Sequence, residues 1–156
     1  MNLIFSLSLT SCLVILVDFD LTLCHSSYPF LGEPFEFAQE IMTKWYNQGA
    51  YLIINTCRTG KPELEAEAWL LANGIPFHKV NGHHPNGQLE FGNDTTHSLG
   101  LSARKIHGHL NIDDTNLDWA VNGFPSWYDI DSLVQKYIDK HGEKYNIKSN
   151  YSKQKV

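Results

Sequence analysis

The sequence has little cysteine and no long block of basic residues. Its 156 residues include three cysteines, and no two of them have the C-x-x-C spacing of metal or redox motifs. Unpaired thiols of this kind are typical of cytoplasmic proteins, and we expect that location. The formal net charge is -5 at pH 7, so stable electrostatic binding of nucleic acid is not expected.

Long hydrophobic runs are also missing. The stretch 1–17 is apolar, but serine and threonine interrupt it, and it lacks the positive start and the cleavage site of a signal peptide. We therefore expect no membrane association, with 1–11 an extension whose alternation suits an extra edge strand. The segment Thr59-Gly60-Lys61 lacks the upstream glycine spacing of a P-loop, which argues against that kind of nucleotide site.

The length fits one domain with a sizeable core, because 42% of the residues are hydrophobic. We expect a single domain over residues 1–142, followed by a polar tail over 143–156. The longest loop is expected at 81–100, where the sequence is polar and rich in glycine.

Short apolar runs alternate with helical patterns along the chain. Strands are predicted at 13–17, 50–55, 76–80 and 109–112. Helices are predicted from Pro34 to Gly49, from Thr59 to the stop at Asn73-Gly74, and from Asp131 to His141 with Asp129 or Asp131 as its cap. A short helical turn is expected at 102–106. This alternation predicts an α/β fold, a three-layer sandwich around a mostly parallel, Rossmann-like sheet.

Two of the predicted strands end in pairs of carboxylates. The first leads into Asp18-Phe19-Asp20, and the fourth leads into Asp113-Asp114. Ligands of open parallel sheets bind at the carboxyl ends of the strands, so these side chains are expected to share one site. Carboxylate oxygens suit a hard divalent cation, and Mg²⁺ is the expected cofactor.

The same residues suit phosphoryl transfer. One carboxylate of the pair Asp18 and Asp20 could attack phosphorus while the other serves as general acid and then as general base. A cation would offset the repulsion between an anionic nucleophile and an anionic phosphoryl group. Donors for the phosphoryl oxygens are available in Thr56 and Arg58, after the second strand, and in Lys105, before the fourth. Arg58 could instead contact the substrate or an aspartate.

The order of these residues resembles a known family. Asp18-x-Asp20-x-Thr22, then Thr56, Lys105 and Asp113-Asp114 are similar to the four motifs of the haloacid dehalogenase (HAD) superfamily of phosphatases. The resemblance spans 13–128. A Tyr-Pro-x-x-Gly-Glu-Pro segment at 28–34 is similar to one in small bacterial and phage hydrolases of that superfamily.

The resemblance implies a HAD-like fold and a role for each motif residue. Asp18 would form an aspartyl-phosphate, and Asp20 would be the acid/base whose backbone carbonyl also contacts the metal. Thr56 and Lys105 would bind the phosphoryl group. Magnesium would be held by Asp18, Asp20, Asp113 and Asp114, the last directly or through water. The residue that is often glycine after the second aspartate is Leu21 here.

The resemblance also implies an open site. The segments between the motifs are short for a large cap, so the site would be open or covered by another subunit unless 81–100 forms a small lid. We therefore expect a cytoplasmic, magnesium-dependent phosphatase acting on a small phosphorylated substrate, with a homo-oligomer as one arrangement.

Other interpretations of the same residues stay open. A nucleotidase or polynucleotide end phosphatase is the nearest enzymatic alternative, and a non-catalytic module that binds metal or a phosphorylated ligand is the alternative of another class. A glycosyltransferase would need a nucleotide-sugar domain that the chain has no room for. Aspartates also follow strands as turn or cap residues, and Asp114 could serve as such a cap. The histidines lack the flanking pattern of a zinc site.

Overall fold

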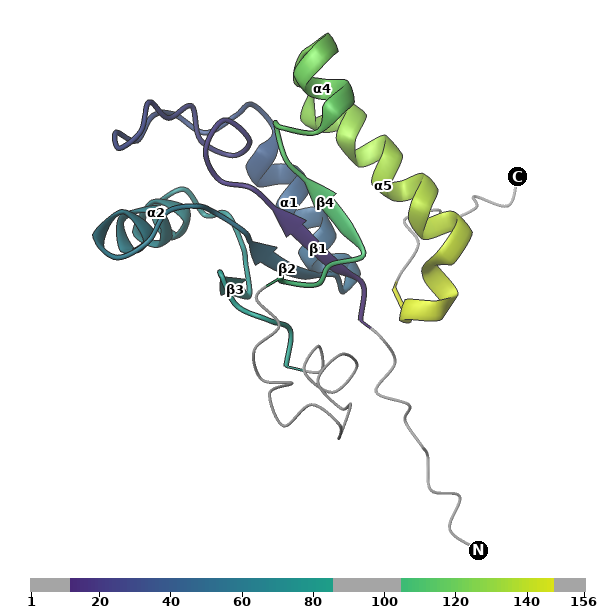
Figure 1. The fold of residues 1–156 in the computed structure, drawn as a ribbon. Coiled ribbons are helices and arrows are strands. Elements are labelled where there is room, and N and C mark those ends of the chain that lie inside the picture. The colour runs from purple at the N-terminus through teal and green to yellow at the C-terminus, as the bar shows by residue number, and fades with distance from the viewer. Residues whose placement is uncertain (1–11, 86–104, 148–156) are drawn as a thin grey trace, which may run out of the picture.

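The computed structural model describes residues 12–85 and 105–147 (Figure 1). Along the chain the elements are β1 (Val14–Val17), α1 (Ala38–Gln48), β2 (Tyr51–Ile54), α2 (Lys61–Ala72), β3 (Lys79–Val80), β4 (Leu110–Ile112), α4 (Leu117–Asn122), α5 (Trp127–His141) and a 3-10 helix (Gly142–Tyr145). Parallel strands with flanking helices confirm the predicted α/β class.

The four strands of the described sheet lie in the order β3-β2-β1-β4, and every pair is parallel. In this register Val17 lies beside both Ile54 and Ile112. The strands β1 and β4 are far apart in sequence but adjacent in space, so the segments that follow them emerge side by side. The two predicted carboxylate pairs therefore reach the same edge of the sheet.

The core lies mainly on one face of the sheet. Leu13, Ile15 and Val17 are fully buried there, together with apolar side chains of α1, α2 and α5. A smaller cluster on the opposite face contains Val14 and Leu16, with Ile53 of β2. Strands buried on both faces explain why the sequence shows continuous apolar runs and no alternation.

Helix α1 begins at Ala38, so the prediction of a start at Pro34 was wrong. Pro34 instead forms an isolated bridge with Cys24, and the Phe35 N–H donates to the Leu23 carbonyl over 2.8 Å. The segment after β1 is therefore a closed loop whose two ends pair with each other. This loop projects outward from the sheet in Figure 1.

Helix α5 begins four residues earlier than predicted. Its cap is Ser126, whose hydroxyl accepts the Asp129 N–H, and neither Asp129 nor Asp131 is the cap. Asp131 is buried instead, and its carboxylate joins α5 to α1 by accepting from Lys44 and, over 2.8 Å, from Trp45 Nε1. The sequence did not reveal this buried role, because an aspartate near a helix start is usually a cap.

Several other expectations meet the structure only in part. Helix α4 was not predicted, because it is short and has no buried residue. The first residues of the expected tail form the 3-10 helix, whose Tyr145 packs against the core. The expected strand at 1–11, most of the turn at 102–106 and most of the loop at 81–100, with its lid, lie outside the described residues. All three cysteines are free, and no helix in the described part of the chain is long and apolar enough to cross a bilayer.

Two histidine rings accept hydrogen bonds from strand N–H groups, the role that peptide carbonyls usually have in a sheet. His78 Nδ1 accepts the Leu52 N–H over 3.0 Å, and His109 Nδ1 accepts the Val14 N–H over 2.9 Å. The backbone N–H of each histidine also donates to the carbonyl of the same partner residue. These contacts require neutral imidazoles, because a protonated ring has no acceptor nitrogen.

We expect this arrangement to make stability depend on pH. Burial and the nearby His84 lower the pKa of His78 from its ordinary value of 6.5. As the pH falls below that value, the unfolded chain binds the proton that the folded chain resists, so the free energy of unfolding should decrease. Urea titrations at pH 7.5 and 5.5 measure this loss.

The variant His78→Asn is the matched test, because its amide oxygen keeps an acceptor near the Leu52 N–H but does not titrate. Its loss of stability between the two pH values should be smaller than that of the wild type. An equal loss would show that His78 does not contribute to the acid sensitivity.

Candidate functional site

The carboxyl edge of β1 and β4 holds a cluster of three carboxylates. The Asp18 N–H donates to the Ile112 carbonyl over 2.8 Å, which continues the pairing of β1 with β4 by one residue. At this point Asp18, Asp113 and Asp114 each offer a carboxylate oxygen, and these oxygens all lie within 4.8 Å of one another. The structure therefore brings together three of the four predicted metal ligands.

Thr22 connects the two segments that form this cluster. Its buried hydroxyl donates to Asp18 Oδ2 over 3.2 Å and accepts the Asp114 N–H over 3.1 Å. Its carbonyl accepts from Trp127 Nε1 over 3.1 Å, which anchors the loop to α5. The sequence placed Thr22 in the first motif but gave it no role, and the structure assigns it a positioning role.

The ionisation of Asp18 depends strongly on its surroundings. Burial, a hydrogen bond with Asp114 and the charge of Asp113 together raise the pKa of Asp18 to about 8. The cluster thus concentrates negative charge that a cation would neutralise. Its ligand atoms are all carboxylate oxygens, which fit Mg²⁺ and do not fit a soft metal.

Asp113 is held by its own turn. Its Oδ1 accepts both the N–H and the hydroxyl of Thr115, over 2.9 and 2.7 Å. These bonds fix the carboxylate and leave Oδ2 for another partner. Asp113 is therefore oriented by two hydrogen bonds within its own turn.

We expect Mg²⁺ to raise the thermal unfolding temperature by several degrees. A ligand present at 100 times its Kd adds about 2.7 kcal/mol, and in a chain of this size each kcal/mol shifts the midpoint by about 2–4 °C. Asp113→Asn should reduce this increment sharply. The control is Asp139→Asn, which removes an exposed carboxylate of α5. An equal increment in both variants would exclude Asp113 as a ligand.

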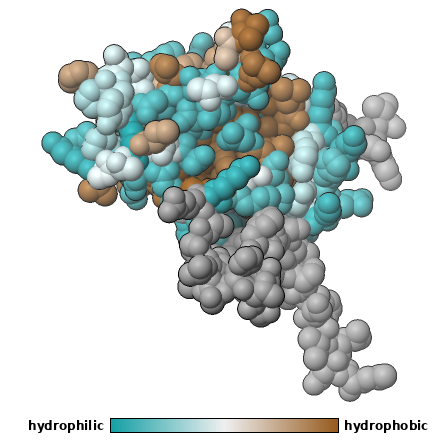
Figure 2. Space-filling model, in the orientation of Figure 1, coloured by the Kyte–Doolittle hydropathy of each residue, from teal (hydrophilic) through white to brown (hydrophobic). Residues whose placement is uncertain are grey.

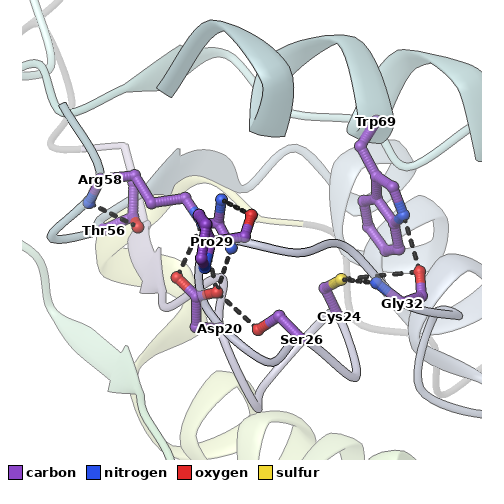
Figure 3. Close-up of polar contacts among 8 residues, drawn as sticks. All are labelled: Asp20, Cys24, Ser26, Pro29, Gly32, Thr56, Arg58 and Trp69. Atoms are coloured by element: carbon purple, nitrogen blue, oxygen red, sulfur yellow. Dashed lines mark hydrogen bonds and ion pairs between the residues drawn. The ribbon is translucent and has the colours of Figure 1, made fainter. Parts of the chain in front are cut away.

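Asp20 does not join the cluster through its side chain. Its carboxylate faces Arg58, whose Nε lies 2.9 Å from Oδ2 and whose Nη2 lies 2.7 Å from Oδ1 (Figure 3). The Ser26 hydroxyl also donates to Oδ1. Burial alone would raise the pKa of Asp20, but the hydrogen bonds from Arg58 and Ser26 outweigh it and lower the pKa. Asp20 is therefore an ionised carboxylate.

Arg58 was predicted as a phosphate ligand, with contact to an aspartate as the alternative, and in the structure it pairs with Asp20. Its side chain is 1% exposed, and its guanidinium lies over the rings of Phe19 and Tyr28 at 5.2 and 5.1 Å. Nη1 donates to the Pro29 carbonyl over 3.2 Å. The guanidinium thus forms its contacts with Asp20 and with the projecting loop.

Thr56 lies just beyond the end of β2, next to Asn55, which continues the pairing of β2 with β1. Its hydroxyl accepts the Arg58 N–H over 3.2 Å, and its own N–H donates to Asn81 Oδ1 over 2.8 Å. Asn81 also donates from Nδ2 to the Arg58 carbonyl, so it holds the turn after β2 at two points. Asn81 was missed because it has no motif, although asparagine is favoured at its positive φ of 49°.

Lys105 is exposed and lines a cavity of about 580 Å³ on the sheet face that carries Leu16. Asn55 and Asn111 line the same cavity. Asn55 lies beside Asp18 in the register, so the cavity begins next to the acidic cluster. In the described part of the chain no ion pair joins Lys105 to that cluster, so its predicted contact with phosphate depends on its side chain extending toward the edge.

Comparisons with known proteins extend these observations modestly. No family model matches the chain. It is 25% identical over 125 residues to the isoleucine–tRNA ligase of Proteus mirabilis and 26% identical to that of Yersinia enterocolitica, matches that cover 80% of this chain. The chain spans only 12% of the length of either ligase.

A solved structure gives a closer likeness. A conserved protein from Bacteroides thetaiotaomicron is 28% identical, with a TM-score of 0.65, and the match covers 81% of this chain and 93% of that one. The chain therefore shares its α/β fold with a protein of similar extent.

Proposed function

We propose that this protein is a magnesium-dependent phosphohydrolase of the HAD superfamily that cleaves a small phosphomonoester through an aspartyl-phosphate. The observation that carries this proposal is the convergence of Asp18, Asp113 and Asp114 at the carboxyl edge of two adjacent parallel strands. The contacts of Thr22 with Asp18 and Asp114, and the place of Thr56 just beyond β2, support the proposal. The 28% identical structural neighbour, whose name states no activity, supports only the α/β part of the proposal.

Asp18 would be the nucleophile. One of its oxygens forms a bond to phosphorus as the bond between phosphorus and the leaving-group oxygen breaks. Thr22 donates to Oδ2, which orients the carboxylate so that Oδ1 can attack. A bound magnesium ion would screen the repulsion between carboxylate and phosphoryl group, and Asp18, Asp113 and Asp114 would hold it.

Asp20 would handle the protons. In the first half-reaction it gives a proton to the leaving-group oxygen, and in the second it takes a proton from the water that attacks phosphorus. Arg58 and Ser26 keep Asp20 ionised, which is the form required for the second half-reaction. The negative charge of a bound phosphoryl group acts in the opposite direction, because a nearby like charge favours the protonated carboxyl.

The experiment that tests this proposal is turnover of p-nitrophenyl phosphate with Mg²⁺ and after its removal by EDTA. We expect hydrolysis with the metal, loss of hydrolysis with EDTA, and recovery when Mg²⁺ is restored. A panel of phosphomonoesters then ranks substrates by kcat/KM. Absence of turnover across the panel, with Mg²⁺ binding retained, would favour the non-catalytic binding module.

A further inference from the structure

The loop that follows β1 exposes several large apolar side chains, of which three are the most exposed. Leu21 is 48% exposed, Tyr28 66% and Phe30 74%. We call these three side chains the apolar rim. Single exposed hydrophobic residues are normal on a protein surface, but three within ten residues of one loop indicate a binding surface. Other hydrophobic side chains reach the surface over α4, at the upper edge of Figure 2, away from Asp20 in the chain.

The loop that carries the apolar rim is held at its base. Trp69 Nε1 of α2 donates to the Gly32 carbonyl over 2.9 Å (Figure 3). The backbone N–H of His25 donates to the Glu33 carbonyl over 2.8 Å. The Cys24 thiol also lies against Gly32. The exposed aromatic side chains are therefore presented by a fixed support, as a binding surface requires.

The backbone at Leu21 adds a second observation. Its φ is 59°, a conformation that costs a residue with a side chain about 1–2 kcal/mol relative to the right-handed region and that glycine adopts freely. Leucine is present here, and its side chain is not used in the core because it is exposed. Backbone strain of this kind concentrates at functional sites.

All three rim residues are connected to Asp20, either directly along the chain or through its partners. Leu21 follows it in the chain, and the ring of Tyr28 lies 5.1 Å from Cζ of Arg58, the ion-pair partner of Asp20. Phe30 exchanges backbone hydrogen bonds with Ser27, next to the serine whose hydroxyl donates to Asp20. The apolar rim is therefore tied, through the chain and through the partners of Asp20, to the carboxylate that meets the leaving group in the proposed reaction.

We infer that the apolar rim binds a planar, apolar leaving group, so that the substrates are phosphomonoesters of aromatic alcohols or of nucleosides. This inference rests on the proposed function, because only the reaction places the leaving group beside Asp20. Arg58 is buried and already paired, so it offers no charge for a second phosphate. A sugar or glycerol group would gain little from the apolar rim, since its hydroxyls would lose water without finding partners there.

The test compares benzyl phosphate, glycerol phosphate and a nucleoside 5′-monophosphate. All three are esters of alcohols that need a proton from a general acid, so their rates differ mainly through binding of the leaving group. We expect kcat/KM for benzyl phosphate to exceed that for glycerol phosphate by about tenfold, which corresponds to about 1.4 kcal/mol. Phe30→Ala should reduce that ratio mainly through KM.

Leu133→Ala is the matched control, because it removes a 55% exposed side chain from α5. The ratio should be unchanged in this variant. If the wild type prefers neither planar ester over glycerol phosphate, or if Phe30→Ala does not alter the preference, the inference is overturned. A preference for the nucleoside monophosphate that Phe30→Ala removes supports it and identifies the planar group as a base.

A binding measurement separates this inference from the proposed function. Calorimetry with Asp18→Asn and Mg²⁺ reports affinity for the same three esters without turnover. Tighter binding of the planar esters, weakened by Phe30→Ala, supports the apolar rim even if the wild type hydrolyses nothing. If all three esters bind equally and the wild type hydrolyses them, the apolar rim has no role in binding and the proposed function is unaffected.

Discussion

Asp18→Asn is expected to abolish phosphatase activity, with a loss of at least about 1,000-fold in kcat. A carboxamide cannot form the bond to phosphorus, while its shape preserves the contact with the Thr22 hydroxyl. The measurement is turnover of p-nitrophenyl phosphate with saturating Mg²⁺. Covalent labelling of wild-type protein, lost in the variant, would locate the phosphoryl group on Asp18.

The same substitution should not unfold the protein. Burial and the two neighbouring carboxylates raise the pKa of Asp18 to about 8, so the ionised form is unfavourable in the metal-free fold, and the neutral amide avoids that cost. The thermal midpoint without Mg²⁺ should therefore be equal to that of the wild type or higher. Asp118→Asn, on the exposed surface of α4, serves as the matched control and should retain activity. Appreciable turnover by Asp18→Asn would contradict the nucleophile assignment.

Arg58→Met is expected to cost about 2–3 kcal/mol of unfolding free energy. Loss of one partner from a buried ion pair usually costs about 3–5 kcal/mol, and the 28% exposure of Asp20 reduces that figure. The stacking on Phe19 and Tyr28 is also weakened. Urea unfolding measures the change.

Lys61→Met is the matched control for Arg58→Met. Lys61 forms an ion pair with Glu65 at 3.6 Å, but its side chain is 86% exposed, so its removal should change stability by less than about 0.5 kcal/mol. Similar losses in the two variants would show that burial does not distinguish the two pairs.

Arg58→Met should also change the pH dependence of turnover. Without the guanidinium the pKa of Asp20 rises, so the limb of the pH–rate profile that reports this carboxylate should move to higher pH. Its orientation is lost as well, and kcat for an alkyl phosphate should fall by about 100-fold. An unchanged profile would indicate that Asp20 does not transfer the proton.

The sequence predicted the parts of the fold that depend on local pattern. Buried parallel strands show as apolar runs, and Gly49 and the pair Asn73-Gly74 mark helix ends, so β1, α2 and the end of α1 were located well. The start of α1 was misplaced because Pro34 suits either a first helical turn or the closing bridge of a loop. Only contacts with Leu23 and Cys24, distant in the pattern, decide between them.

The sequence predicted which carboxylates lie in the candidate site, but it did not predict which side chains pair with each other there. Motif order identified Asp18, Asp113 and Asp114, and the parallel register brings them together. The ion pair between Asp20 and Arg58 joins residues 38 positions apart. The sequence pattern does not distinguish an arginine that is buried and paired from an arginine that is available to bind phosphate. That distinction depends on the projecting loop, which covers Arg58 with the ring of Tyr28.

The two histidines that replace carbonyls in the sheet have a consequence for how the protein would fail in acid. The His109 ring accepts the N–H of Val14, the first residue of β1, and the His78 ring accepts the N–H of Leu52, the second residue of β2. The carboxylate cluster lies at the opposite edge of the sheet, after β1 and β4. Protonation of His78 would thus loosen β2 from the end opposite to the carboxylate cluster. In mild acid the backbone amide of Leu52 should exchange its hydrogen faster before the carboxylate edge is disturbed.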